Sequence, residues 1–277
     1  MRVEPCFAGP GLAVWWLPLP TKGAPRPADA ELLSRHELER MSRFRDERDA
    51  ARYAAVHAGA RRLVALSLGV ELSKVELGRR ACPVCASSQH GPPCIAKPET
   101  TAGLSLSRSG PHGVVAISEQ GPVGVDIEEV RPFPSLAATA NRYMSSRELL
   151  FFERARPDDR LCAFFRCWTR KEAVAKAWGV GMAVDFAQLD ADVAKDGHND
   201  PVLVNSAATL ATAAPPAPGE TAVAAAASSG EMATTTRCHA YDFSPRPGLA
   251  GAVAVPLLGS LTWPAGQLAS EAPAGTT

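Results

Sequence analysis

A short segment with charges at helical spacing constrains this chain more than any other feature. Trp168-Thr-Arg-Lys-Glu-Ala-Val-Ala-Lys176 sets a carboxylate and an ammonium four residues apart, in an otherwise apolar run that predicts a helix over 161–178. Residues four apart share one face of a helix, so Trp168, Glu172 and Lys176 form a stripe, and Lys171 points roughly a quarter-turn away. Such a pair also decorates solvated helix surfaces, where it contributes only ~0.3–0.5 kcal/mol. The stripe alone therefore indicates either the wall of a site or a solvated face.

A second acidic element upstream favours the site. In Gly124-Val-Asp126-Ile-Glu128 a strand would point both acidic residues to one face and the apolar residues to the core. Two carboxylates on one strand face repel each other unless a cation lies between them. Carboxylate oxygens suit Mg²⁺ or Mn²⁺, and Mg²⁺ also keeps waters and takes substrate phosphate oxygens. Together with Glu172 these residues predict a magnesium site in which the protein supplies only part of the ligands. Gly124, which has no side chain, would let a diphosphate approach the strand.

The two motifs together resemble the signature pair of the 4′-phosphopantetheinyl transferases, specifically the larger, surfactin-synthetase-type class. The resemblance extends over roughly residues 30–190. It implies an α+β fold of two similar halves related by a pseudo-twofold axis, with the active site at their interface. We expect these halves at residues 1–122 and 123–263.

A weak internal repeat agrees with duplicated halves. Glu37 to Gly69 and Glu148 to Gly179 each enclose a polar turn followed by a long predicted helix, and the two separations differ by one residue. Repeats of this length suggest that each half contributes one long helix.

The resemblance also implies an activity, namely transfer of the 4′-phosphopantetheine arm of coenzyme A to a serine of an apo acyl- or peptidyl-carrier domain, releasing adenosine 3′,5′-bisphosphate. Mg²⁺, or Mn²⁺ in its place, would be held by Asp126, Glu128 and Glu172. Glu172, directly or through a water, would accept the serine proton, and Lys176 with Lys171 nearby would stabilise or protonate the leaving phosphate. Carrier domains of polyketide and nonribosomal peptide biosynthesis are the partners that the resemblance implies.

Coenzyme A contacts are implied for residues in both predicted halves. These are Arg40, Arg52, Gly91, Pro93, Ser107, Arg108 and Lys171. The two arginines of the first helical region fall where the family meets phosphates, the 3′-phosphate especially, and guanidinium matches phosphate geometry.

The chain departs from the family pattern at two positions. The coenzyme A loop normally reads Gly-Lys-Pro or Gly-Arg-Pro, but here Pro92 replaces the cation; and where the family has Ser-His-Ser, this chain has Arg108 between two serines. Arginine keeps a charge that does not depend on pH. These departures leave open a second hypothesis, a catalytically impaired homologue that binds coenzyme A or the carrier without turnover.

A third hypothesis comes from the cysteines. Cys82, Cys85, His90 and Cys94 have the order and approximate spacing of a zinc knuckle, so a structural zinc stays open. The spacing is imperfect, and aromatic or basic residues that would bind single-stranded nucleic acid are missing.

Composition excludes other classes of protein. Lys plus Arg and Asp plus Glu both number 29, so the balanced charge gives no argument for nucleic-acid or membrane binding. Apolar runs are too short for a membrane span, and the seven dispersed cysteines fit reduced thiols. We expect a cytoplasmic monomer.

The C-terminal part is predicted to contain strands at 202–204, 237–243 and 249–255. Between the first two, the Ala-, Thr-, Ser- and Pro-rich stretch at about 205–236 predicts a low-complexity insertion. Residues 264–277 predict a flexible tail.

Overall fold

The computed structural model describes residues 5–87, 91–198, 200–206 and 237–257. Its helices and strands follow the chain in this order: β1 Phe7–Gly9, β2 Leu12–Pro18, α1 Pro27–Ala30, α2 Arg35–Met41, α3 Glu47–Leu68, β3 Glu76–Arg79, β4 Pro93–Lys97, β5 Gly103–Ser109, β6 His112–Ser118, β7 Gly124–Glu129, α4 Leu136–Tyr143, α5 Ser146–Arg154, α6 Pro157–Ala177, β8 Leu189–Asp190, β9 Val202–Ser206, β10 Arg237–Phe243 and β11 Leu249–Pro256. Helices lie in groups against antiparallel sheets, which confirms the α+β class.

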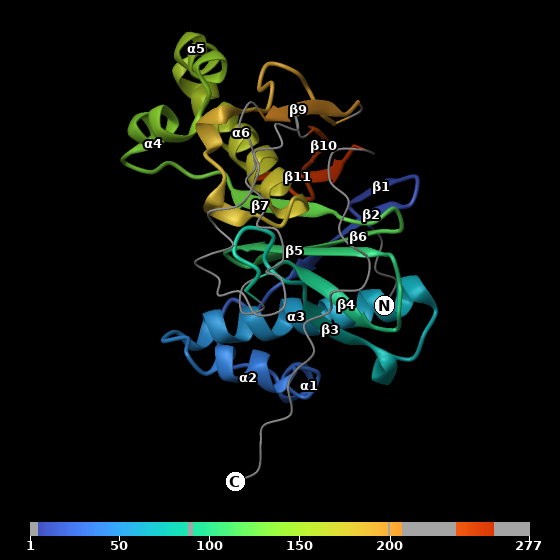
Figure 1. The fold of residues 1–277 in the computed structure, drawn as a ribbon. Coiled ribbons are helices and arrows are strands. Elements are labelled where there is room, and N and C mark those ends of the chain that lie inside the picture. Colours follow the sequence, from blue (N-terminus) through green and yellow to red (C-terminus); the bar gives the residue numbers. More distant parts are fainter. Residues whose placement is uncertain (1–4, 88–90, 199, 207–236, 258–277) are drawn as a thin grey trace.

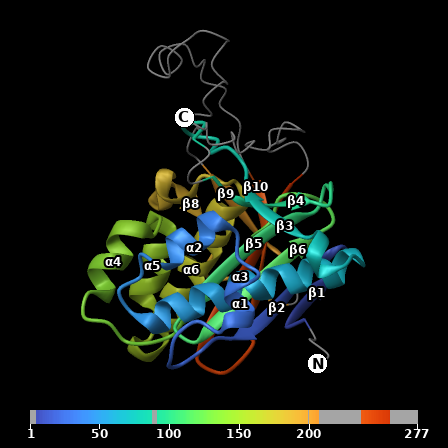
Figure 2. The same ribbon diagram turned by 90° about the horizontal axis from the view of Figure 1, so that it is seen from below.

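The first sheet has the strand order β1-β2-β6-β5, and α3 packs against it. Apolar side chains of α3, such as Leu63 and Val64, share a buried cluster with Val115 and Ile117 of β6. The helices α1 and α2 contact α3, and Figure 1 shows the three gathered on one side of the molecule. Figure 2 shows α3 from that side.

The second sheet has the order β7-β11-β10-β9-β8, and α6 packs across β7 and β11. Its core contains Ala173, Val174 and Trp178 against Ala252 and Ala254 of β11. In Figure 1 the helices α4, α5 and α6 lie on the side opposite α1–α3, and the strands β5 and β7 run between the two groups of helices.

The two sheets adjoin where β5 lies beside β7. The hydroxyl of Ser105 accepts a hydrogen bond from Val125 N at 3.0 Å, and the hydroxyl of Ser109 accepts one from Glu129 N at 3.1 Å. Side chains two apart share one face of a strand, so the serines of β5 all point at β7. This seam holds the acidic strand in place.

Helix boundaries follow local capping chemistry. Asp46 accepts from Arg48 N at 2.8 Å to start α3, and Gly69 ends it with φ +65°, as the sequence predicts. The helix predicted over 161–178 begins earlier, at Pro157. Proline is suited to the first helical position, and acidic residues in the first turn favour the helix dipole.

Other predicted elements compare as follows. The strands predicted in the C-terminal part correspond to β9, β10 and β11, although β9 continues to Ser206. The hairpin β3–β4 is not predicted, and the helices α4 and α5 lie between the acidic strand and α6. Most of the predicted insertion (207–236) and the tail (264–277) lie outside the described residues.

Within the described residues, none of the helices combines the length and the apolar character that crossing a membrane requires.

Candidate functional site

The acidic strand β7 presents its carboxylates to the serines of β5. Val125 and Ile127 are fully buried in the core, as the alternation predicts. On the other face Ser107 Oγ donates to Asp126 Oδ1 at 2.7 Å, and Ser109 Oγ donates to Glu128 Oε2 at 2.7 Å. The hydroxyls orient the carboxylates without neutralising them.

Helix α6 brings the second motif to the same place because Gly124 lets it approach. A Cβ on Gly124 would lie 1.8 Å from the carbonyl oxygen of Ala173. The role predicted for Gly124 is therefore wrong, since α6 occupies the space expected for a diphosphate. Through this close packing Lys176 Nζ donates to Asp126 Oδ1 at 2.6 Å and to Val125 O and Ser107 Oγ, each at 3.1 Å.

Three carboxylates converge beside this lysine. Burial raises the pKa of Glu172, and the charges of Asp126 and Glu128 raise it further against the opposing effect of Lys176. Burial likewise raises the pKa of Glu128, with Asp126 adding to the effect while the hydrogen bond from Ser109 opposes it. Asp126, Glu128 and Glu172 are thus near enough for their charges to affect one another, and their joint role as a site stays a prediction.

These carboxylate oxygens are of the chemical type that a hard divalent cation takes, although the three do not all lie within 4.8 Å of one another. Asp126 is only 3% exposed, and its Oδ2 atom is buried with no hydrogen-bond partner. A buried carboxylate oxygen without a partner is costly unless a cation or donor reaches it. The arrangement provides oxygen ligands and an excess of negative charge, which are what Mg²⁺ takes.

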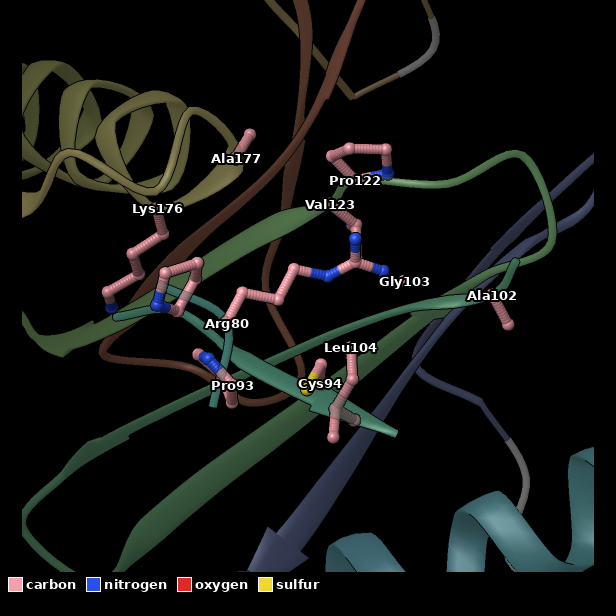
Figure 3. A pocket seen from close by; sticks show the side chains of 11 residues that line it. Arg80, Pro93, Cys94, Ala102, Gly103, Leu104, Pro122, Val123, Lys176 and Ala177 are labelled. Atoms are coloured by element: carbon pink, nitrogen blue, oxygen red, sulfur yellow. The ribbon is translucent and has the colours of Figure 1, made fainter. Parts of the chain in front are cut away.

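A cavity of about 660 Å³ opens next to Lys176. It is lined by residues of α3, of the segment from β3 to β4, of β5 and of the turn after α6; among them are His57, Arg79, Gly91, Pro92, Pro93, Ser105, Lys176 and Met182. Gly91 and Pro93, predicted to contact coenzyme A, both line it. Figure 3 shows a smaller adjoining pocket, in which Lys176 from α6 lies near Pro93 and Arg80.

Arginines gather around Asp49 of α3. Arg52 donates to Pro20 O at 3.1 Å and pairs with Asp49 at 3.4 Å, and Arg108 lies 4.0 Å from the same carboxylate with its guanidinium over the Phe44 ring. Burial lowers the pKa of Arg108, and the nearby charges of Arg52 and Arg40 contribute to this against Asp49. The three arginines predicted from the sequence therefore lie together.

Sequence reasoning missed a fourth arginine of this group. Burial lowers the pKa of Arg79, and the nearby charge of Arg40 lowers it further. Arg79 also lines the cavity. The only signal in the sequence is the pair Arg79-Arg80 at the end of a short apolar run, which does not reveal which side chain turns toward the ligand side.

The prediction for Lys171 is contradicted. Its side chain is 1% exposed, and Nζ donates to the Glu148 carboxylate, to Tyr143 O at 2.9 Å and to Phe186 O at 2.8 Å. All its donors are used inside the protein, so Lys171 anchors α5 to α6 and does not reach a ligand. Trp168, on the stripe of Glu172, packs in the aromatic cluster with Tyr143.

The zinc hypothesis gains no support from the cysteines. Among the described residues, the group whose ligand atoms lie close enough together for a metal is Asp196, His198 and Asp242. Asp242 is already held by Arg170 through two hydrogen bonds, of 2.8 and 2.6 Å. His90 lies outside the described residues, so the complete knuckle stays a hypothesis.

Comparison with known proteins agrees with the motifs. A family model described as the 4′-phosphopantetheinyl transferase superfamily matches residues 122–223, which include all three converging carboxylates and Lys176. The chain is similar to this superfamily over these residues, and the resemblance found in its sequence is confirmed.

Individual relatives are named for the same activity. The 4′-phosphopantetheinyl transferase AcpT of Salmonella typhimurium is 40% identical over 98 residues, which cover 34% of this chain and 50% of that protein. The 4′-phosphopantetheinyl transferase HetI of a Nostoc species is 29% identical over 172 residues, covering 61% of this chain and 69% of that protein. The 4′-phosphopantetheinyl transferase ffp of Bacillus subtilis is 26% identical over 167 residues, 60% of this chain and 69% of its own length.

Proposed function

We propose that this protein transfers the 4′-phosphopantetheine arm of coenzyme A to a serine hydroxyl of an apo acyl- or peptidyl-carrier domain. The observation that carries the proposal is the proximity of the charges of Asp126, Glu128 and Glu172 to Lys176, which lines a cavity together with Arg79. The serine oxygen forms a bond to phosphorus, the bond from phosphorus to the bridging diphosphate oxygen breaks, and adenosine 3′,5′-bisphosphate leaves.

The residues have distinct roles in this proposal. Asp126, Glu128 and Glu172 would hold Mg²⁺, with Mn²⁺ as an alternative, and the bound ion would supply positive charge to the diphosphate. Glu172 takes the serine proton, directly or through a water, and its raised pKa makes it a stronger base than an exposed carboxylate. Lys176 is 28% exposed, and in the proposal it exchanges one of its three internal acceptors for the leaving phosphate.

The two parts of the chain contribute different charges. In the proposal, residues 1–122 supply the nucleotide contacts through Arg40, Arg52 and Arg108, and residues 123–263 supply the acidic site. The pseudo-twofold relation of these halves belongs to the proposal as well. The protein would act as a cytoplasmic monomer on carrier domains of polyketide or nonribosomal peptide synthases.

The test is mass spectrometry of an apo carrier protein after incubation with this chain, coenzyme A and Mg²⁺. The expected product is a carrier with one added phosphopantetheine. Glu172→Gln keeps the shape, removes the charge and should lower the rate about a hundredfold or more, since proton transfer by a positioned group contributes that much.

The matched control is Glu153→Gln, the same change on an exposed part of α5. It should leave both rate and melting temperature unchanged. No modified carrier with the wild-type chain, or a near wild-type rate for Glu172→Gln at saturating Mg²⁺, would contradict the proposal.

A further inference from the structure

Arg79 occupies a fixed place at the edge of the cavity. It is the last residue of β3 and pairs in register with Pro93, the first residue of β4. Its Nη1 atom donates to the carbonyl oxygen of Gly91 at 2.8 Å. The guanidinium therefore lies against the segment Gly91–Pro93, the loop in which this chain lacks the cation of the family pattern.

Backbone contacts hold Gly91 and Pro92 against the end of β3. Arg80 N donates to Pro92 O at 2.9 Å, and a Cβ on Gly91 would lie 1.6 Å from the carbonyl oxygen of Arg80. Only glycine permits such a close approach of the two chain segments. Arg79 thus lies beside the segment that contains Pro92, and both residues line the same cavity.

The charge of Arg79 has no acidic partner in the described part of the chain. No carboxylate there lies within ion-pair distance of it, and the nearby Glu37 already accepts from Arg61 at 2.6 Å and contacts His57 at 2.8 Å. Burial and the charge of Arg40 both act against the guanidinium. A partly buried cation beside another cation is costly unless an anion binds there, and guanidinium matches a phosphate monoester in geometry.

We propose that Arg79 supplies the phosphate-binding cation that Pro92 does not provide, and that it binds the 3′-phosphate of coenzyme A together with Arg40. The inference rests on the proposed function, which makes coenzyme A the ligand. Arg40 is one of the two arginines that the resemblance assigns to the phosphates, the 3′-phosphate especially, and its charge acts on Arg79.

Binding of nucleotides tests this assignment without turnover. Calorimetry would compare coenzyme A with dephospho-coenzyme A, which lacks only the 3′-phosphate, on wild type, Arg79→Gln and Arg79→Lys. Glutamine keeps an N–H donor for Gly91 O but no charge. We expect Arg79→Gln to raise the Kd for coenzyme A about ten- to a hundredfold, the range for one charge-assisted contact, and to leave the Kd for dephospho-coenzyme A unchanged.

The compensation with Pro92 gives a second readout. Adding Pro92→Lys to Arg79→Gln should recover most of the lost affinity, because it returns a cation to the family's position, and Arg79→Lys should keep most of it. Arg35→Gln, the same charge change on an exposed, ion-paired arginine of α2, should bind both nucleotides like wild type.

The outcomes separate this inference from the proposed function. Equal weakening of both nucleotides by Arg79→Gln, unchanged binding of both, or failure of Pro92→Lys to recover affinity would overturn the inference. A wild-type chain that binds coenzyme A with this selectivity but modifies no carrier would contradict the proposed function and leave the role of Arg79 supported.

Discussion

The short helices α2 and α5 are built alike, yet they support regions of opposite charge. In each, a serine begins the helix and a glutamate three residues later closes a capping box: Ser34 with Glu37, and Ser145 with Glu148. Each glutamate then binds a cation on the following long helix, Glu37 to Arg61 at 2.6 Å and Glu148 to Lys171. One construction therefore fixes a short helix to a long helix twice in the chain.

The difference lies in the charge that remains after these pairs are made. Around α3 it is positive, because Asp49 is the one ion-pair partner that the structure gives, among the described residues, to the group Arg40, Arg52, Arg79 and Arg108. Around α6 it is negative, because Lys176 faces three carboxylates. A diphosphate ligand between the two regions would meet arginines on one side and, through a cation, carboxylates on the other. Opposite excess charge on equivalent scaffolds thus accounts for how similar elements perform different tasks.

The largest effect is expected from removing Lys171, the cation that pairs with Glu148. Lys171→Met leaves the Glu148 carboxylate, whose side chain is 0% exposed, without a counter-charge. Loss of one partner of a buried pair costs about 3–5 kcal/mol, so the free energy of unfolding in urea should fall by that amount.

Lys176→Met is the matched control for this variant, because it changes the same residue type on the same helix. The Lys176 side chain is 28% exposed and its partner Asp126 keeps Ser107, so stability should change less while turnover is lost. If Lys171→Met instead melts like wild type and loses coenzyme A binding, Lys171 acts at the site as the family resemblance implies.

The contribution of the Glu37–Arg61 pair to stability is expected to depend on pH and to fall in acid. Burial alone would raise the pKa of Glu37, but the hydrogen bonds from His57 and Arg61 outweigh it and lower the pKa well below the usual range. A lowered folded-state pKa gives stability that is present above the unfolded value, about 4.3, and is lost as pH falls below it. Wild type should therefore exceed Glu37→Gln by about 1.5–3 kcal/mol at pH 6, and the difference should shrink at pH 3.

Urea titrations at the two pH values measure this difference. Glu39→Gln, on an exposed residue of the same helix that pairs with Arg35, should change stability little at either pH. A difference between wild type and Glu37→Gln that is equal at pH 6 and pH 3 would mean that the carboxylate does not carry the stability.

The acidic site could be predicted from sequence because its spacing is local. Strand and helix periodicity put Asp126 with Glu128, and Glu172 with Lys176, on shared faces, and the resemblance joined the two motifs. The error at Lys171 arises because its partner Glu148 lies 23 positions away, so no local period reveals the pair. Gly124 was misinterpreted for the same reason, since the helix that packs on it follows much later in the chain.

Arg79 shows the corresponding limit for the cavity. Which of two adjacent arginines turns to the ligand side depends on the register of a hairpin, and the strand β3 was not predicted. Its pairing with β4 includes an irregularity between Glu76 and Leu77, and a shift of one residue reverses which side chains share a face.

The smallest effect is expected at Arg108, where the chain has arginine in place of the family's histidine. Asp49 lies 4.0 Å away and offsets part of its charge, so Arg108→Ala should weaken coenzyme A binding less than Arg79→Gln does, and equally at pH 6 and pH 8. Guanidinium stays charged throughout this range, whereas a histidine with a pKa near ~6.5 loses its charge within it. The nearby Arg40 and Arg52 would disfavour a charged imidazole further. Arg108→His should therefore keep only part of the wild-type affinity for coenzyme A at pH 6, and it should bind like Arg108→Ala at pH 8. Calorimetry of coenzyme A binding at both pH values checks this, with wild type as the pH control. Unchanged binding by Arg108→Ala at both pH values would show that the side chain, held over Phe44, does not reach the phosphates, and the positive region would then depend on Arg40, Arg52 and Arg79 alone.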